Sequence, residues 1–378
     1  MNRRVMFYAQ HLLGIGHLKR AALLARGMVA AGLEVSVVLG GRQVPGISFD
    51  GCARILLPAV HAADATFKLL RDEDGQPIDD AWRDRRAARL MLEYQSLRPD
   101  VLMVELFPFG RRMFAFELLP LLSAARAASR PPRIVCSLRD ILVRKPGVDR
   151  DRKSIACARA CFDRILIHGD ERLVPIEASY PAMSALKDML SYTGYVVDRS
   201  DGGEQGPSPI GAGEVIVSVG GGAVGLPLLR AALQAKPICS LANRTWRLIA
   251  GPNLPDDAFS ELAWSKPPGV IVERWRDDLP AMLRTCALSI SQAGYNTVMD
   301  LLRAGARAVL VPFAEPGESE QTLRAAILEA RGRVATVAGE LSPQILAEAI
   351  ERALTLPITS VDIDCSGVEM TAKIVKTL

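Results

Sequence analysis

The stretch of sequence that most constrains the fold is residues 286–324, CALSISQAGYNTVMDLLRAGARAVLVPFAEPGESEQTLR. An apolar run ends at Ser291, a glycine turn follows, and a helical pattern closed by Gly305 leads to a second apolar run before Pro312. Strand, turn, helix, strand and helix in this order are typical of a parallel α/β domain. Ligands of such domains bind where the strands end and the helices begin. The stretch therefore predicts a ligand site beside Gly294.

The polar residues of this stretch suit a nucleotide sugar. Backbone N–H groups at the helix start after Gly294 suit a phosphate group. Asp300 lies about two turns into that helix, and Glu320 and Gln321 open the next one. Their side chains suit hydroxyl groups. A phosphate site beside groups that bind hydroxyls predicts a nucleotide sugar as the ligand.

Several spaced motifs resemble the donor half of glycosyltransferase family 28, the MurG-like transferases. The motifs are S-x-A-G-x-x-T-x-x-D at 291–300, V-P-F at 311–313 and E-Q-x-x-R-A at 320–325. The similarity covers 214–335 and, as GIGHLKR, also 14–20. It implies the GT-B fold, an α/β architecture in which two Rossmann-like lobes with parallel sheets face each other across a central cleft.

The resemblance also implies donor-binding roles. The implied residues are Gly221 and Gly222 for the diphosphate, Trp275 and Arg276 for a uracil base, Asp300 for the ribose, Glu320 and Gln321 for the sugar, and Ser291, Gly294, Asn296 and Thr297 around them. For Trp275 the alternative is a residue that packs at the edge of the domain. Family loops carry paired glutamines and a downstream asparagine where this chain has Glu320, Gln321 and Arg324, so N-acetylglucosamine is not implied as the sugar.

Two glycine loops could also suggest a dinucleotide site, but both lack its other marks. The loop at 220–225 fits G-x-G-x-x-G, yet Asn243 and Arg244 stand where an acid is expected about 20 residues later. The loop at 14–16 lacks the third glycine. NAD binding is therefore not expected. The glycines of 220–225 still allow backbone amides to close on a pyrophosphate, and a plain tight turn is the alternative.

His17 is the candidate catalytic base. It stands at a predicted helix start, where the positive end of the helix dipole favours a neutral imidazole that accepts protons. From the chemistry alone, a capping or supporting histidine is the alternative. The resemblance of GIGHLKR to the first loop of MurG-like transferases and related nucleotide-sugar hydrolases places this histidine at the reaction centre, with Gly16 on the acceptor side.

Polar residues near the ends of other predicted strands are candidates for the acceptor side. Glu105, near the end of the run at 101–106, is a second candidate catalytic residue, and Arg111 and Arg139 are candidates for contact with the acceptor. For the loop that carries Arg111, the alternative is a surface loop with buried phenylalanines. The apolar segment 113–122 suits either an interfacial lipid acceptor or a core helix.

Length and composition predict two domains and a cytoplasmic protein. The segment 199–213 is rich in Gly, Pro and Ser and predicts a linker. It separates an acceptor-binding domain at 1–198 from a donor-binding domain at 214–360, and 361–378 is expected to form a helix that returns to the first lobe. No apolar run approaches the roughly 18 residues of a membrane span, and the start does not indicate a secretory leader. The seven scattered cysteines indicate thiols in a reducing cytoplasm.

Charge and acidic motifs limit the partners. A net charge of +4 and 5% aromatic residues argue against nucleic acid. Asp-x-Asp tripeptides occur at 72–74, 149–151 and 362–364, away from predicted strand ends, so no catalytic metal is expected. No cofactor is expected either, because the nucleotide diphosphate sugar is the substrate. The other partner is an acceptor saccharide, lipid-linked or other small molecule, and peripheral membrane contact through the first lobe remains open.

Together these inferences predict an inverting, metal-independent glycosyltransferase that uses a UDP-sugar. Three alternatives share the donor half: a nucleotide-sugar hydrolase, an epimerase, and a nucleotide-sugar binding protein without turnover. The transferase ranks first because the long segment between the GIGH loop and the linker leaves room for an acceptor site.

Overall fold

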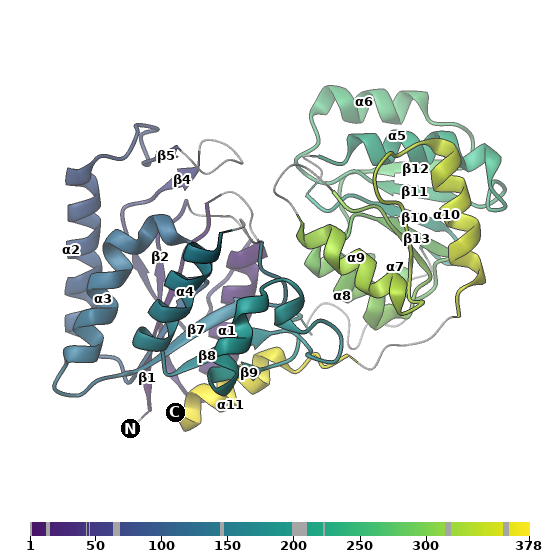
Figure 1. The fold of residues 1–378 in the computed structure, drawn as a ribbon. Coiled ribbons are helices and arrows are strands. Elements are labelled where there is room, and N and C mark those ends of the chain that lie inside the picture. Colours follow the sequence, from purple (N-terminus) through teal and green to yellow (C-terminus); the bar gives the residue numbers. More distant parts are fainter. Residues whose placement is uncertain are drawn as a thin grey trace. The chain divides into compact units, whose positions relative to one another are not determined.

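The chain divides into two compact units (Figure 1). The computed structural model describes residues 2–12, 16–42, 44, 46–62, 69–143, 147–198, 210–221, 224–313, 319–357 and 363–378. Met1–Val197 and Asp364–Leu378 form the first unit, and Asp198–Ile363 form the second. Most of the segment predicted as a linker, 199–209, lies outside the described residues.

A seven-stranded parallel sheet forms the centre of the first unit, in the order β3-β2-β1-β6-β7-β8-β9. Its strands are β1 (Arg4–Ala9), β2 (Glu34–Leu39), β3 (Ala53–Leu56), β6 (Val101–Glu105), β7 (Arg133–Arg139), β8 (Arg164–His168) and β9 (Leu190–Tyr192). The apolar runs of the sequence correspond to β1, β2, β6, β7 and β8. The sequence gives no such run for β3, because it is an edge strand with mostly exposed side chains.

Helices cover both faces of this sheet. They are α1 (Gly16–Ala30), α2 (Asp80–Leu97), α3 (Ala115–Ala127), α4 (Val148–Cys161) and α11 (Gly367–Thr377), with 3-10 helices η1 (Arg112–Phe114), η2 (Ile176–Ala178) and η3 (Pro181–Met189) and a hairpin of β4 (His61–Ala62) and β5 (Leu70–Arg71). Successive side chains of a strand point to opposite faces. Val5 and Phe7 therefore pack with α1 and α11, while Met6 and Tyr8 pack with α2, α3 and α4.

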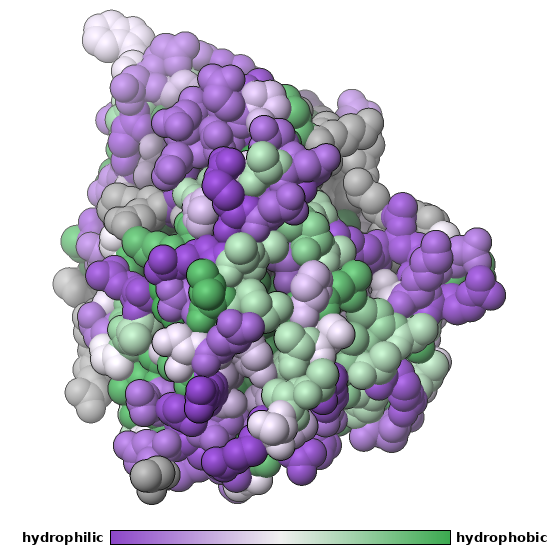
Figure 2. All heavy atoms as spheres, turned by 90° about the vertical axis from the view of Figure 1, so that its left-hand side faces the viewer, coloured by the Kyte–Doolittle hydropathy of each residue, from purple (hydrophilic) through white to green (hydrophobic). Residues whose placement is uncertain are grey.

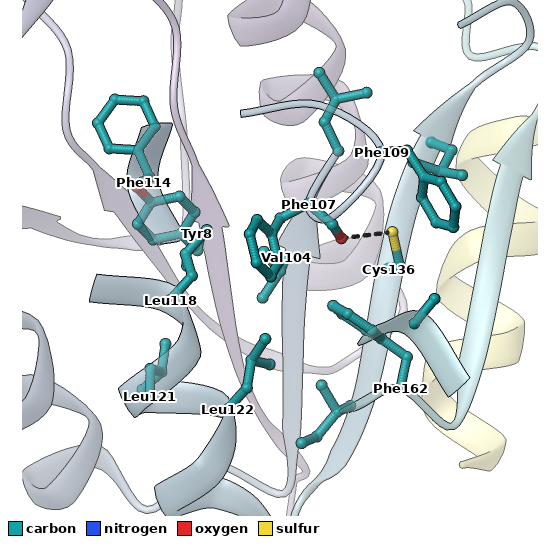
Figure 3. Close-up of a cluster of buried hydrophobic side chains, with 14 of the residues drawn as sticks. Tyr8, Val104, Phe107, Phe109, Phe114, Leu118, Leu121, Leu122, Cys136 and Phe162 are labelled. Carbon is teal, nitrogen blue, oxygen red and sulfur yellow. Dashed lines mark hydrogen bonds between the residues drawn. The ribbon is translucent and has the colours of Figure 1, made fainter. Parts of the chain in front are cut away.

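Aromatic side chains fill the core on the α2–α3–α4 side (Figure 3). Phe107 and Phe109, from the loop after β6, are 3% and 4% exposed. The thiol of Cys136 donates to the carbonyl oxygen of Phe107 at 3.2 Å. The ring of Phe109 meets the ring of Tyr180 edge-on, with centroids 5.6 Å apart. Both phenylalanines therefore belong to the core and do not line an acceptor pocket.

The last helix, α11, packs against α1. The ammonium group of Lys376 donates to the carbonyl oxygen of Ala31 at 2.8 Å. Val368 lies directly against Gly27, where a β-carbon would clash with its side chain. The N–H of Gly367, at the start of α11, donates to the carbonyl oxygen of Tyr195 at 3.1 Å. The end of the chain is thus built into the first unit.

We expect Gly367→Ala to destabilise the first unit by about 1–3 kcal/mol, the usual cost of overpacking. A β-carbon there would lie 2.6 Å from the carbonyl oxygen of Gly194 and 2.7 Å from the carbonyl carbon and oxygen of Tyr195. Gly294→Ala is the matched control, because its φ is −64° and no described atom lies within 4 Å of the new β-carbon. Urea denaturation measures the free energy of unfolding of both variants. Equal urea midpoints for Gly367→Ala and Gly294→Ala would contradict the close packing at Gly367.

A six-stranded parallel sheet, in the order β12-β11-β10-β13-β14-β15, forms the centre of the second unit. The strands are β10 (Val215–Ser218), β11 (Trp246–Ile249), β12 (Val270–Glu273), β13 (Leu288–Ser291), β14 (Ala308–Leu310) and β15 (Ala335–Thr336). The helices are α5 (Leu226–Ala235), η4 (Lys236–Ile238), α6 (Asp256–Ser265), α7 (Leu279–Leu283), α8 (Tyr295–Ala304), α9 (Glu320–Ala330) and α10 (Pro343–Thr355). The strand, turn and helix expected from residue 286 onward correspond to β13 and α8.

Both sheets have the strand order of a Rossmann fold. The order reverses between β1 and β6 in the first unit and between β10 and β13 in the second. Open parallel sheets bind ligands outside the carboxyl ends of the strands at such a reversal. Each unit therefore has one expected site of its own.

Candidate active site

The residues inferred from the sequence lie mainly at these two reversals. In the first unit, His17 follows β1 on helix α1, and Glu105 ends the neighbouring β6. In the second unit, Gly221 follows β10, and Ser291 ends the neighbouring β13.

His17 and Glu105 are in direct contact. Nδ1 of His17 lies 3.1 Å from Oε1 of Glu105, and Nη2 of Arg20 donates to the same oxygen at 2.7 Å. The side chain of Glu105 is 2% exposed and that of His17 is 19% exposed. Arg20 was not among the residues inferred from the sequence, although its spacing of three residues from His17 on a helix indicates a shared face.

Nδ1 of His17 has two neighbours at 3.1 Å, Oε1 of Glu105 and Nη2 of Arg20. Arg20 already donates to Glu105, and an ionised carboxylate only accepts hydrogen bonds, so the tautomer with the proton on Nδ1 pairs with the carboxylate and leaves Nε2 as the acceptor. Burial lowers the pKa of His17 to about 4, against the opposing effect of Glu105. Burial raises the pKa of Glu105, but His17, Arg20 and Arg111 outweigh it and lower the pKa. Since His17 is neutral at pH 7, the two arginines are the cations that keep Glu105 ionised there.

Arg111 and Arg139 lie close to this pair. Arg111 follows β6, and its Nε donates to the carbonyl oxygen of Gln10 at 2.9 Å. Arg139 ends β7, in register with His168 of β8. Burial lowers the pKa of Arg111, Glu105 raises it, and the positive charge of Arg139 lowers it further. The structure thus brings both arginines, which were acceptor-side candidates, to the same edge of the sheet as Glu105.

His168 is a buried polar residue that the sequence did not single out as catalytic. Its Nε2 lies 2.7 Å from Oγ of Ser137, and its Nδ1 lies 2.9 Å from Oγ1 of Thr193. Burial, followed by the charge of Arg20, lowers the pKa of His168 to about 3. Both ring nitrogens are engaged within the unit, so this residue supports the strand ends.

We expect acid to destabilise the first unit well above pH 4. Folded His17 and His168 have pKa values of about 4 and about 3, whereas a histidine of the unfolded chain titrates near pH 6.5. Between these values the unfolded state binds more protons, so stability falls as pH falls, by up to about 1.4 kcal/mol per pH unit for each histidine. Urea denaturation between pH 7 and 4.5 measures how steeply the free energy of unfolding falls with pH, and His168→Gln should make this slope smaller. A stability independent of pH in this range would contradict both shifts.

The glycine loop of the second unit follows β10. Gly220 has a φ of +57°, a left-handed conformation that favours glycine. The carbonyl oxygen of Gly221 accepts a hydrogen bond from the N–H of Asn253 at 2.9 Å. Gly222 lies outside the described residues, as do Gly14 and its neighbours in the first loop. Of the expected diphosphate pair, only Gly221 can therefore be placed.

The turn after β13 leads directly into α8. Gly294 precedes the first helical residue, and apart from Gly294 and its chain neighbours no described atom lies within 4 Å of a β-carbon built on it. The first N–H groups of a helix have no partner within the helix, so an open space here suits an anion. Asn296 is exposed, Thr297 and Asp300 are half-buried, and Ser291 is buried. All five candidates of this stretch therefore lie within or just before the first two turns of α8.

Trp275 and Arg276 follow β12, two strands from β10. The side chain of Trp275 is 54% exposed, and its indole N–H donates to Asp277 at 2.7 Å. Arg276 donates two hydrogen bonds to Asp278, both at 2.7 Å. The ring of Trp275 is thus presented to the surface, whereas the guanidinium of Arg276 already has a carboxylate partner.

Glu320 and Gln321 also have partners within the unit. Oε1 of Glu320 accepts from Nη2 of Arg324 at 2.8 Å, and Oε1 of Gln321 accepts from the N–H of Phe313 at 3.1 Å. Arg324 is 1% exposed, and its Nη1 donates to the carbonyl oxygen of Ala293 at 3.0 Å. The sequence marked Arg324 only as a departure from the family, because the contact with the turn before α8 is not visible in the spacing of residues along α9.

The acidic tripeptides, as far as the structure describes them, do not gather into a metal centre. Asp72 accepts from the backbone N–H groups of Asp74 and Gln76, and Asp149 pairs with Arg152 on the surface of α4. Asp362 lies outside the described residues. Among the residues that the structure describes, no group of three or more His, Cys, Asp or Glu side chains is placed to hold a metal ion.

A known protein family matches most of the second unit. Residues 216–359 match the glycosyltransferase family 28 C-terminal domain. The UDP-N-acetylglucosamine--N-acetylmuramyl-(pentapeptide) pyrophosphoryl-undecaprenol N-acetylglucosamine transferase of Synechococcus sp. (strain CC9605) is 30% identical over 159 residues, which are 41% of this chain and 42% of that relative. The chain therefore matches less than half of the length of this curated relative.

Solved structures extend the likeness to both units. The glycotransferase of kitacinnamycin has a TM-score of 0.65 at 15% identity, over 99% of this chain and 96% of that one. Acinetobacter baumannii MurG has a TM-score of 0.59 at 14% identity, over 100% of both chains. At these identities the likeness shows the fold alone. The chain therefore has the GT-B fold, and residues 216–359 of its second unit match the glycosyltransferase family 28 C-terminal domain.

Proposed function

We propose that the protein is an inverting glycosyltransferase that moves a sugar from a UDP-sugar to an acceptor hydroxyl. The observation that carries the proposal is the contact of 3.1 Å between His17 and Glu105 at the carboxyl edge of the first sheet, because it provides a proton acceptor. The family 28 domain supports the donor side. The name of the Synechococcus relative, a UDP-N-acetylglucosamine transferase, supports uridine diphosphate as the first nucleotide to test.

In this mechanism Nε2 of His17 takes the proton of the acceptor hydroxyl. The hydroxyl oxygen bonds to the anomeric carbon while the bond from that carbon to the diphosphate breaks, and the electron pair leaves with the diphosphate. Because the nucleophile enters opposite the leaving group, the anomeric configuration inverts. Glu105 holds Nδ1–H and stabilises the imidazolium as it forms. General-base catalysis of this kind contributes about 10² to 10⁴ in rate.

The second unit would bind the donor. Amides at Gly221 and at the start of α8 would stabilise charge on the departing diphosphate, and preorganised donors of this kind contribute roughly 2.7 to 4 kcal/mol each, so the proposal requires no metal. Asp300 would accept hydrogen bonds from the ribose hydroxyls. The exposed ring of Trp275 would stack on the base, and the sugar would lie toward Gln321 at the start of α9.

The acceptor is proposed to be a saccharide or a lipid-linked small molecule that binds beside Arg111 and Arg139. Figure 2 shows apolar side chains among polar ones on the side of the first unit that carries α2 and α3. Leu92 is 62% exposed, Met113 is 38% exposed and Leu119 is 44% exposed. None of the described helices is both long and apolar enough to cross a membrane. This face is proposed for peripheral membrane contact.

Sedimentation with vesicles that contain anionic lipid tests the membrane contact. We expect Leu119→Glu to lower the bound fraction, because it places a negative charge in the exposed apolar face of α3. Arg159 of α4 forms an exposed ion pair with Asp188 of η3. Arg159→Gln is therefore the control variant, and it should leave the bound fraction unchanged. A bound fraction equal in wild type and Leu119→Glu would contradict the contact.

A thermal-shift panel with UDP, dTDP, GDP, ADP and NAD tests the donor side. Ligand at about 100 times its dissociation constant stabilises a protein by roughly 2.7 kcal/mol, which moves the midpoint measurably. A shift with UDP or dTDP supports the proposal. A shift with NAD and with none of the nucleotide diphosphates contradicts it.

Product analysis separates transfer from the other reactions of this fold. Wild-type protein with a UDP-sugar and a panel of acceptors should release UDP and form a glycoside. Free sugar formed without any acceptor would identify a hydrolase, and a changed sugar on the nucleotide would identify an epimerase. Nucleotide binding with no product under any condition would identify a binding protein.

A further inference from the structure

A buried cation lies beside the turn that leads into α8. Arg324 stands in the second turn of α9, and its side chain is 2% exposed. A buried guanidinium is costly unless it is paired and hydrogen-bonded. The hydrogen bonds and the ion pair of Arg324 must therefore offset the cost of burying its charge.

Arg324 contacts groups on both sides of Gly294. Its Nη1 donates to the carbonyl oxygen of Ala293 at 3.0 Å, and its guanidinium lies 5.7 Å from the centroid of the Tyr295 ring. Its Nη2 donates to Glu320, one turn back on α9, at 2.8 Å. A planar guanidinium can serve a carbonyl, a carboxylate and an aromatic face at once, which an ammonium group cannot. Arg324 thus connects α9 to the turn that presents the first amides of α8.

We propose that Arg324 is a positioning residue for the donor diphosphate, and that Glu320 is its counter-ion rather than a ligand of the sugar. The inference rests on the proposed function, because it needs a nucleotide diphosphate at the start of α8. Amides that are already fixed bind an anion without first losing conformational freedom. Because Glu320 neutralises Arg324, the pair acts on the geometry of the turn and adds no net charge beside the diphosphate.

Binding of UDP and of uridine to matched variants tests this inference. Calorimetry measures the affinity for UDP, and ligand-observed NMR measures the affinity for uridine, which is the weaker ligand. We expect Arg324→Met to lower the affinity for UDP by roughly 10- to 100-fold, which is the range for the loss of one hydrogen bond to a charged group. Uridine should bind as it does to wild type, because it has no diphosphate. A purely structural defect would weaken both ligands.

Two further variants separate the roles of the pair. Glu320→Gln still offers Arg324 an oxygen but removes its counter-charge, so we expect any change in the KM for the UDP-sugar to match the change in UDP affinity. Arg324→Lys keeps the positive charge but loses the planar fork, so we expect weaker UDP binding while uridine binds as it does to wild type. This variant also carries the test if Arg324→Met does not fold.

The outcomes distinguish this inference from the proposed function. UDP affinity equal to wild type in Arg324→Met, or in Arg324→Lys if the Met variant does not fold, would overturn the positioning role. A higher KM for the UDP-sugar in Glu320→Gln, at unchanged UDP affinity, would return Glu320 to the sugar and overturn its assignment as counter-ion. Wild-type protein that binds no nucleotide diphosphate would refute the proposed function itself and this inference with it.

Discussion

Replacement of His17 with Ala is expected to lower the turnover number by about 10² to 10⁴. The imidazole is held by Glu105 at 3.1 Å, with Nε2 left to take the proton of the acceptor. His168 cannot replace it, since both nitrogens of His168 are engaged with Ser137 and Thr193. The affinity for UDP should stay at the wild-type value, because the proposed donor residues lie in the second unit. Steady-state kinetics and calorimetry on the same preparations measure both quantities.

The pH dependence of kcat/KM gives the same prediction a second readout. The pKa of about 4 for His17 means that the imidazole is already neutral at pH 5, so the acid limb of the profile should lie near pH 4 rather than near 6.5. His17→Gln should remove this limb. Wild-type turnover in the Ala variant would eliminate His17 as the base.

Replacement of Glu117 with Met is expected to lower the free energy of unfolding by about 3–5 kcal/mol. Glu117 of α3 and Arg86 of α2 form an ion pair whose side chains are both 0% exposed, with Nε and Oε2 at 2.8 Å. The hydroxyl of Tyr8 donates to the same carboxylate at 2.5 Å. Removing the carboxylate alone leaves a buried guanidinium without its counter-charge. Urea denaturation measures the loss.

Two further variants show whether the unpaired charge causes this loss. The double variant Arg86→Met with Glu117→Met should recover much of the stability, because apolar residues often replace a buried ion pair without loss. Glu93→Gln is the exposed control on α2, since Glu93 and its partner Arg89 have side chains that are 23% and 56% exposed. Its effect should stay within about 1 kcal/mol. Equal losses for Glu117→Met and Glu93→Gln would contradict the account of the buried pair.

The sequence predicted best where local pattern decides the structure. Ser291, Gly294 and Gly305 mark the end of β13, the turn into α8 and the end of that helix, because strand period, glycine turn and helical period follow one another directly. The resemblance placed His17 at the reaction centre, and Glu105 was a candidate from its place near a strand end. The structure shows the two in contact. Strand β3 escaped prediction because an exposed edge strand carries no apolar run.

Long-range pairing is what the sequence did not show. Arg20, His168 and Arg324 each look like ordinary polar residues, and their burial follows only from how strands and helices meet. Glu320 illustrates the limit, because its place in a family motif suggested a sugar ligand while its carboxylate meets Arg324 four residues later. Phe107 and Phe109 were equally consistent with a pocket and with a core, and only packing decided between the two.

Calorimetric titration of UDP into wild type and Gly294→Leu tests the central claim, a nucleotide diphosphate at the start of α8. Leucine fits the backbone there, since φ is −64°, and no described atom lies within 4 Å of the new β-carbon. Its side chain would fill the space in front of the helix amides. Gly16→Leu is the matched control at the equally open position in the first unit. The account predicts that UDP binds wild type and Gly16→Leu but not Gly294→Leu; equal UDP binding by all three proteins would contradict it.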